Sequence, residues 1–135
     1  SAAIAGYTVA NDISMRDWQS RTLQWFQGKA FDRTTPLGPV LVTPDECDPE
    51  AGVRVRCLVN GEEVQNGNTK TLVFTAAALL SYISTFTRLS PGDVVLTGTP
   101  GGVGMGATPP RFLRDGDVVT TEVEGIGTLT NTVRL

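Results

Sequence analysis

The chain has 135 residues, and its 11 lysine and arginine residues are outnumbered by 14 aspartate and glutamate residues. With 40% hydrophobic residues it can build one core, so it belongs with neither disordered nor low-complexity chains. An acidic balance without a basic stripe argues against nucleic-acid and membrane partners, and the longest aliphatic run, residues 76–80, is too short for a membrane span. We therefore expect residues 1–135 to form a single domain.

The first predicted elements are a strand and a helix. Residues 4–10 have the pattern of a short buried strand. Ser14 is a predicted helix N-cap, with Asp17 three residues later as a variant of the capping box. Both tryptophans fall on one apolar face of this helix, which is expected to end at Gly28 and to bury them. That face consists of Met15, Trp18, Thr22, Trp25 and Phe26.

A hairpin is the clearest signal in the middle of the chain. Residues 40–43 are predicted to form a short strand, and the alternation over residues 53–59 predicts a half-buried one. Arg54 and Arg56 would lie on its solvated face. The dipeptide Asn60-Gly61 favours a tight turn, so the chain should return antiparallel directly after it.

The second half of the chain predicts another helix and more strands. Thr75 is expected to cap a helix whose apolar face contains Leu79, Leu80, Ile83 and Phe86. Strands are expected over residues 94–96, 118–123 and 129–133. Many short strands with two helices predict a β-rich α+β fold.

Glycines gather in a loop at residues 98–106. The loop lacks the Gly-Lys-Ser/Thr ending of a P-loop, and Pro109-Pro110 prevents the prompt helix of a dinucleotide-binding fingerprint. It is compatible with a plain β connection or with a loop that approaches a ligand. In the second case Thr97 and Thr99 would offer hydroxyls to an anion.

Two residue types limit the chemistry. Histidine is absent, so a Ser-His-Asp triad or a Cys-His dyad within this chain is excluded. Acid/base chemistry must then use lysine, carboxylates or metal-bound water. Cys47 and Cys57 are too few for a disulfide scaffold and are not clustered as in a zinc site. They are typical of reduced thiols and favour a cytoplasmic location.

The candidate site lies around the first strand-to-helix junction. Asp12 ends the strand, Arg16 and Gln19 follow on the same side of the predicted helix, and Lys29 comes directly after Gly28. Such a set can hold a divalent cation together with a carboxylate-bearing ligand. Asp12 and Lys29 also have a structural interpretation. A helix N-terminus stabilises an aspartate such as Asp12 without any ligand, and many lysines in the position of Lys29 are merely solvated.

Six segments, in this order, resemble one known family. They are GYTVANDISMRD, QGKAFD, PLGP, VNGE, LSPGDVVLTGTP and GDVV. Over nearly all of the chain they are similar to the fumarylacetoacetate hydrolase family. Its compact branch contains acylpyruvate hydrolases, oxaloacetate decarboxylases and homoprotocatechuate-pathway isomerase/decarboxylases. The resemblance implies a mixed β-sandwich or roll, incomplete at its N-terminus, and a homodimer.

The resemblance also implies a site and a reaction. Asp12 would be one of three carboxylates that hold Mg²⁺, with Mn²⁺ or Ca²⁺ as substitutes. Arg16, Gln19 and Lys29 would bind the substrate and take part in catalysis, and Thr99 would bind its carboxylate or oxyanion. The substrate would be a small 2-oxo acid that reacts through a metal-stabilised enolate. The reaction would be acylpyruvate hydrolysis, oxaloacetate decarboxylation or a 2-hydroxyhepta-2,4-dienedioate-type isomerisation in aromatic catabolism.

The sequence departs from the family pattern at its start. The family's Glu-x-Glu pair and the His-Glu lid of its hydrolytic members would precede Ser1, and no substitute follows. We therefore expect a C-terminal part of a catalytic domain that is inactive alone. The alternative is a non-catalytic β-rich domain that binds a ligand or serves assembly with an incomplete metal site.

Overall fold

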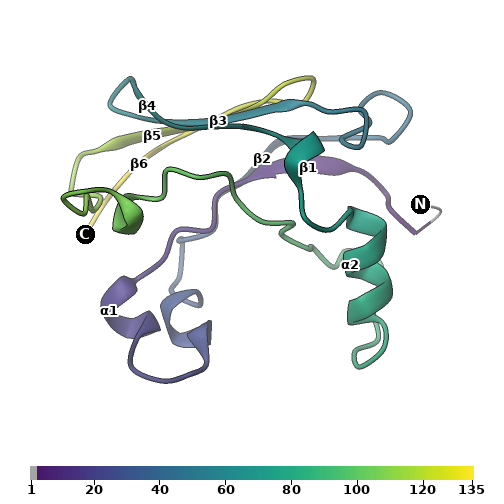
Figure 1. The fold of residues 1–135 in the computed structure, drawn as a ribbon, viewed down its shortest axis with the longest axis horizontal. Coiled ribbons are helices and arrows are strands. Elements are labelled where there is room, and N and C mark those ends of the chain that lie inside the picture. Colours follow the sequence, from purple (N-terminus) through teal and green to yellow (C-terminus); the bar gives the residue numbers. More distant parts are fainter. Residues whose placement is uncertain (1–2) are drawn as a thin grey trace.

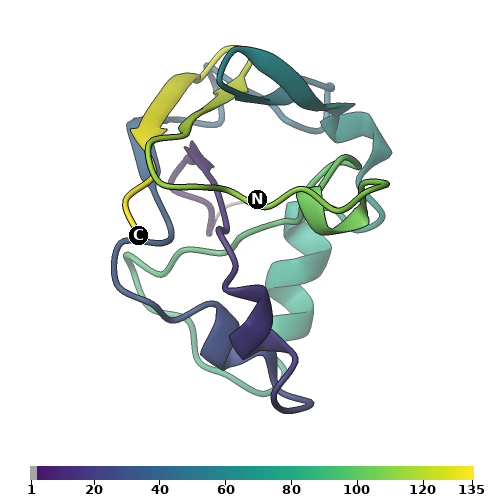
Figure 2. The same cartoon turned by 90° about the vertical axis from the view of Figure 1, so that its left-hand side faces the viewer.

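The computed structural model describes residues 3–135, which form two antiparallel sheets. The larger sheet has the strand order β4-β3-β5-β6, and the smaller one pairs β1 with β2. Figure 1 and Figure 2 show both sheets on one side of the molecule, with α1 and α2 on the other. The strands are β1 (Tyr7–Ala10), β2 (Leu37–Val42), β3 (Arg54–Val59), β4 (Glu62–Asn68), β5 (Val118–Val123) and β6 (Gly127–Thr132). The helices are α1 (Arg16–Gln19), η1 (Trp25–Gly28), η2 (Thr69–Thr71), α2 (Ala76–Ile83) and η3 (Gly104–Gly106).

The predicted hairpin joins β3 to β4. Asn60 and Gly61 both have positive φ, 52° and 81°, which is the backbone of a tight hairpin turn. The Asn60 side chain also donates to Asp117 Oδ1 at 2.8 Å and accepts from the Val118 backbone N–H at 2.8 Å. The turn is therefore attached to the start of β5, which pairs with the other edge of β3.

Two small apolar clusters hold the sheets. The first lies where the two sheets meet, and the second is under the larger sheet. Val9 of β1 is the largest fully buried side chain described and belongs to the first cluster. The first contains Val9, Val42, Cys47 and Ile126, and the second contains Cys57, Val59 and Val119. Both cysteines are free and buried, and burial raises the pKa of each thiol, so neither is an activated nucleophile.

The β-rich α+β class and the hairpin are confirmed, but the first helix was predicted wrongly. Only α1 and the separate η1 form within residues 14–28, and Ser14 is not the N-cap. Trp25 is 65% exposed and Trp18 is 37% exposed, so the predicted burial of the tryptophans is wrong as well. Trp18 instead packs edge to face against Phe31, and the Arg21 guanidinium lies over its ring. The 3.6-residue apolar pattern continues across residues 20–24, where the helix is broken.

Two further predictions are corrected in the second half of the chain. Residues 94–96 are not a strand, and Val94 is 60% exposed. Thr75 caps α2 as predicted, since its Oγ1 accepts from the Ala78 N–H at 3.2 Å. However, α2 ends before Phe86, which is exposed, whereas Leu79, Leu80 and Ile83 of the predicted face are half-buried. Apolar composition alone therefore did not show which segments bury their side chains.

No helix within residues 3–135 is long and apolar enough to cross a membrane.

Candidate functional site

The end of β1 is fixed by Asn11. Its backbone N–H donates to Pro36 O at 3.2 Å, which extends the β1–β2 pairing by one bond. Its side-chain amide donates to Thr121 Oγ1 of β5 at 2.9 Å. Because Thr121 is buried, this bond attaches the strand end to the larger sheet. Asn11 thereby sets the position of the next residue, Asp12.

Asp12 and Lys29 meet beyond that strand end. Lys29 Nζ lies 2.5 Å from Asp12 Oδ2 and 2.7 Å from Ser14 Oγ. Ser14 Oγ in turn donates to the Asp12 carbonyl at 3.2 Å. The Lys29 and Asp12 side chains are 29% and 41% exposed, so the pair is open to solvent and to a ligand. We call Asp12, Ser14 and Lys29 the Asp12–Lys29 corner.

Gly28 allows Lys29 to reach this corner. A Cβ at Gly28 would lie 2.6 Å from Gln19 Cβ, so only glycine permits η1 to approach α1 this closely. The Gly28 carbonyl also accepts from the Met15 N–H at 2.9 Å. The two short helices are thus packed backbone to backbone, and the residue after Gly28 faces the start of α1.

Arg16 and Gln19 form a second pair next to the corner. Arg16 Nη1 donates to Gln19 Oε1 at 2.7 Å across one turn of α1. Gln19 is only 7% exposed, whereas Arg16 is half-buried. The predicted closeness of the two side chains is therefore observed. The buried amide holds the guanidinium and leaves its remaining N–H groups for a carboxylate. The substrate contact itself stays a prediction.

Thr99 lies in a different group of residues. Its side chain is exposed, and its Oγ1 accepts from Gln65 Nε2 of β4 at 2.9 Å. No hydrogen bond between Thr99 and the Asp12–Lys29 corner is described for residues 3–135. The structure thus brings four of the five predicted site residues into two adjoining pairs and leaves Thr99 on the glycine-rich loop.

The described residues do not complete a metal site. Within residues 3–135 no three His, Cys, Asp or Glu side chains come together in a way that could hold an ion. Asp12 is the single carboxylate of the corner, and its partner is an ammonium group. Mg²⁺ requires near-octahedral oxygen coordination, so this donor set supplies one ligand and fits a metal only together with further donors.

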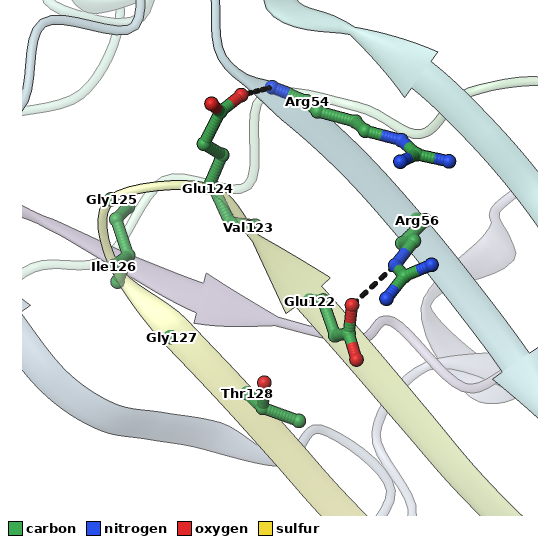
Figure 3. A pocket seen from close by; sticks show the side chains of 9 residues that line it. All are labelled: Arg54, Arg56, Glu122, Val123, Glu124, Gly125, Ile126, Gly127 and Thr128. Atoms are coloured by element: carbon green, nitrogen blue, oxygen red, sulfur yellow. Dashed lines mark hydrogen bonds and ion pairs between the residues drawn. The ribbon is translucent and has the colours of Figure 1, made fainter.

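A separate pocket of about 610 Å³ lies over β3, β5 and the β5–β6 turn. Figure 3 shows Arg56 Nε paired with Glu122, and the Arg54 backbone N–H bonded to Glu124. The Arg54 guanidinium pairs with Glu63 of β4 at 3.2 Å. The hydrogen bond that Arg56 donates to Glu122 is the largest of the effects that raise the pKa of Arg56. None of the five predicted site residues lines this pocket. Its guanidinium groups are already neutralised, which agrees with the predicted solvated face.

Sequence reasoning missed three supporting residues. Ser14, a predicted helix cap, binds Lys29 instead, and Asn11, which carries no prediction of its own, attaches the strand end to Thr121. Gln65 gave no signal beyond its place in the hairpin, although it holds Thr99. Each acts through a contact between residues distant in the sequence, or across a turn that the periodicity did not reveal.

Comparison with known proteins identifies the family. A family model described as fumarylacetoacetate (FAA) hydrolase C-terminal matches residues 1–134. The chain belongs to the fumarylacetoacetate hydrolase family. This confirms the resemblance and, with the solved relatives, the predicted fold type. The fumarylacetoacetate hydrolase of Exiguobacterium antarcticum has a TM-score of 0.94 and 44% identity, covering 98% of this chain and 48% of that one.

The relatives are enzymes, and one is solved with a metal. Oxaloacetate tautomerase fahd2, mitochondrial, of Xenopus laevis is 50% identical over 132 residues, covering 96% of this chain and 41% of the relative. Fumarylpyruvate hydrolase of Pseudomonas aeruginosa, solved with Mn²⁺ and pyruvate, has a TM-score of 0.87 and 34% identity and covers 99% of this chain and 56% of that one. A divalent metal is thus found in the family. The frog relative's name says mitochondrial, and the predicted cytoplasmic location stays a prediction.

The chain spans about half the length of the relatives it matches. The activity, substrate and partners of the whole protein are therefore taken up as proposals.

Proposed function

We propose that the protein interconverts the enol and keto forms of a small 2-oxo acid with a divalent cation, with oxaloacetate as the first substrate to test. The observation that carries this proposal is the Asp12–Lys29 corner, in which an ammonium group lies 2.5 Å from a carboxylate at a solvent-open strand end. The 50% identity to an oxaloacetate tautomerase points to the same substrate class.

Each residue of the proposed site has a role in substrate binding or proton transfer that follows from its functional group. The Arg16 guanidinium, held by Gln19, binds the substrate carboxylate, for which its free N–H groups suit two oxygens. The Thr99 hydroxyl donates to the same carboxylate or to the 2-oxygen. Lys29 Nζ moves the proton. As the ammonium it delivers one to C3 while the enol oxygen releases its own proton to solvent, and the amine that remains takes a proton back from solvent. In the reverse direction the neutral amine takes the C3 proton as the oxygen gains one from solvent. Asp12 and Ser14 orient Nζ through their oxygens.

These residues do not complete the coordination site of the cation. Asp12 would be one of its ligands, and the others would come from outside the described donor set. When bound, a divalent cation supplies Lewis-acid stabilisation of negative charge on the substrate oxygens. Mg²⁺ is the cation we propose, with Mn²⁺ or Ca²⁺ as substitutes.

Acylpyruvate hydrolysis is the second candidate, favoured by the 34% identity to a fumarylpyruvate hydrolase. It shares the enolate but also needs an activated water, whereas tautomerisation needs only proton transfer. Decarboxylation and dienedioate isomerisation would use the same enolate. Of these reactions, tautomerisation therefore requires the fewest catalytic groups beyond the residues described. A homodimer remains part of the proposal, as does the absence of nucleic-acid and membrane partners.

The test is enol-oxaloacetate decay, followed by its ultraviolet absorbance, for the protein at the full length that its gene encodes. We expect decay well above a control that contains Mg²⁺ alone, and parallel assays with acetylpyruvate and fumarylpyruvate for hydrolysis. Turnover of an acylpyruvate without tautomerisation would favour the second candidate. No turnover of any 2-oxo acid would reject both and support the non-catalytic alternative.

A further inference from the structure

The glycine-rich loop is clamped onto β4 by a single glutamine. Gln65 Nε2 donates to Thr99 Oγ1 at 2.9 Å and to Pro100 O at 2.8 Å. Gln65 is half-buried and pairs with the buried Cys57 in the β3–β4 ladder, so it projects from the inner face of the sheet. Two loop residues are therefore held by one side chain that the proposed mechanism does not yet use.

These contacts fix the orientation of the amide. The Pro100 carbonyl can only accept, so the NH₂ end of Gln65 must face the loop. The second N–H of the Gln65 amide then donates to a lone pair of Thr99 Oγ1. A hydroxyl that accepts in this way keeps its own hydrogen for a different partner. Thr99 is exposed, so that hydrogen is available to an anionic ligand.

The loop backbone and the β4 backbone pack too closely at two glycines to admit a side chain there. A Cβ at Gly67 would lie 2.6 Å from Pro100 Cβ, and one at Gly102 would lie 2.0 Å from Val64 O. The loop therefore packs closely against β4 at Pro100 and at Gly102, directly after Thr99. The β3–β4 register shifts between Cys57 and Leu58, which places Val64 in a bulge beside Gln65. Bulges of this kind re-aim neighbouring side chains.

We propose that Gln65 is a positioning residue that holds Thr99 as a hydrogen-bond donor to the carboxylate or enolate oxygen of the ligand. This proposal rests on the proposed function for the class of ligand, a small 2-oxo acid. Gln65 acts through Thr99 and touches no ligand itself. The two residues must therefore behave as one unit when either is altered.

The test measures oxalate binding by calorimetry with Mn²⁺ present, using the protein at its full encoded length. Oxalate carries the carboxylate and oxygen pattern of a 2-oxo acid enolate and does not depend on turnover. Gln65→Met keeps the side-chain length and removes both hydrogen bonds, and we expect it to weaken oxalate binding about 5- to 10-fold. Gln65→Glu should weaken it more, because its carboxylate would capture the Thr99 hydrogen.

A double-mutant cycle separates positioning from a structural role. If Gln65 acts through Thr99, adding Gln65→Met to Thr99→Val should change oxalate affinity less than about 2-fold. The matched control is Asn66→Leu, which removes an amide from the next residue of β4, on the opposite face, where it contacts Arg54 and Glu63. It should leave oxalate affinity within about 2-fold. Thermal unfolding of each variant shows whether the fold is kept.

The possible results distinguish a failure of the positioning role of Gln65 from a failure of the proposed reaction. Fully additive effects, unchanged oxalate affinity in Gln65→Met, or no oxalate binding by the wild-type protein would each overturn the positioning role. If Gln65→Met fails to fold, Gln65→Glu decides the question in the same cycle. Oxalate binding that follows the cycle without turnover of any 2-oxo acid would reject the proposed reaction while upholding the role of Gln65.

Discussion

The four-stranded sheet and the Asp12–Lys29 corner are held together in different ways. In the sheet, hydrogen-bonded ladders run the length of every strand, and the charges on its outer face are paired across strands, as Arg56 is with Glu122. The corner depends on a few single contacts: Asn11 to Thr121, Gly28 against Gln19, and the Lys29 ion pair. The sheet supplies stability, and the corner presents charge to solvent at the end of a strand.

The exposed surface follows the same division. The chain exposes 9338 Å², whereas a compact monomer of 14.3 kDa exposes about 6,800 Å². Large apolar side chains near α1, η1 and α2 contribute to this surface, including Phe26, Phe74 and Phe86, each more than 60% exposed. Within residues 3–135, neither buried apolar cluster contains a residue of α1, η1 or α2, so the geometry of that side depends on how it is joined to the sheets.

The largest expected effect is on catalysis at the corner. Lys29→Met keeps the apolar stem and removes the charge, so kcat on the 2-oxo acid turned over by the wild type should fall about 10²- to 10⁴-fold. The unfolding midpoint should change little, since the Lys29–Asp12 pair is partly exposed. Steady-state kinetics and thermal unfolding of the same preparation check both. An unchanged kcat would make Lys29 a solvated surface residue.

The next effect is on metal affinity. Asp12→Ala removes the only carboxylate of the corner, and Mg²⁺ or Mn²⁺ affinity of the full-length protein should fall at least about 10-fold. Calorimetric titration of wild type and variant measures it. Asp17→Ala, an exposed carboxylate on α1 paired with Arg21, is the control and should bind metal as the wild type does. Equal metal affinities of the wild type, Asp12→Ala and Asp17→Ala would mean that Asp12 is not a metal ligand and has a structural role.

The sheet should show the opposite response. Val119→Ala removes two methyl groups from the buried cluster under the sheet and should lower the free energy of unfolding by about 2 kcal/mol. Val118→Ala, one residue earlier and 38% exposed, should cost much less. Urea unfolding of both gives the difference, and kcat should be unchanged in both. A large loss of kcat in Val119→Ala with native stability would contradict the division between sheet and corner.

The same division explains what the sequence could predict. The Asn60-Gly61 turn and the strand Val118–Val123 follow from local backbone preference and alternation, and both are found where expected. Of the candidate residues, Arg16 contacts Gln19 and Lys29 contacts Asp12, although the predicted helix is broken between α1 and η1. Their roles in a site stay predictions. What brings Lys29 to Asp12 is the contact of Gly28 with Gln19, a tertiary approach that periodicity does not encode.

The smallest effect concerns a carboxylate that attaches the hairpin turn to β5. Asp117 accepts from Asn60 Nδ2 and from the Arg114 N–H, both at 2.8 Å, and these bonds, the one from Asn60 foremost, hold its pKa below the ordinary 3.8. A depressed folded-state pKa adds stability that is present above the unfolded pKa and is lost as the pH falls through the folded value. The wild type should therefore exceed Asp117→Asn slightly in stability at neutral pH.

That advantage should shrink as the pH falls below the unfolded value of about 3.8, and it should disappear once the pH has passed the lower folded value, where the carboxyl is protonated in both states. Unfolding midpoints of the two proteins, measured from about pH 7 down to about pH 2.5, give the difference at each pH. A difference between wild type and Asp117→Asn that stays constant across this range would mean that the side chain stabilises the turn through shape and neutral hydrogen bonds, with no contribution from its charge.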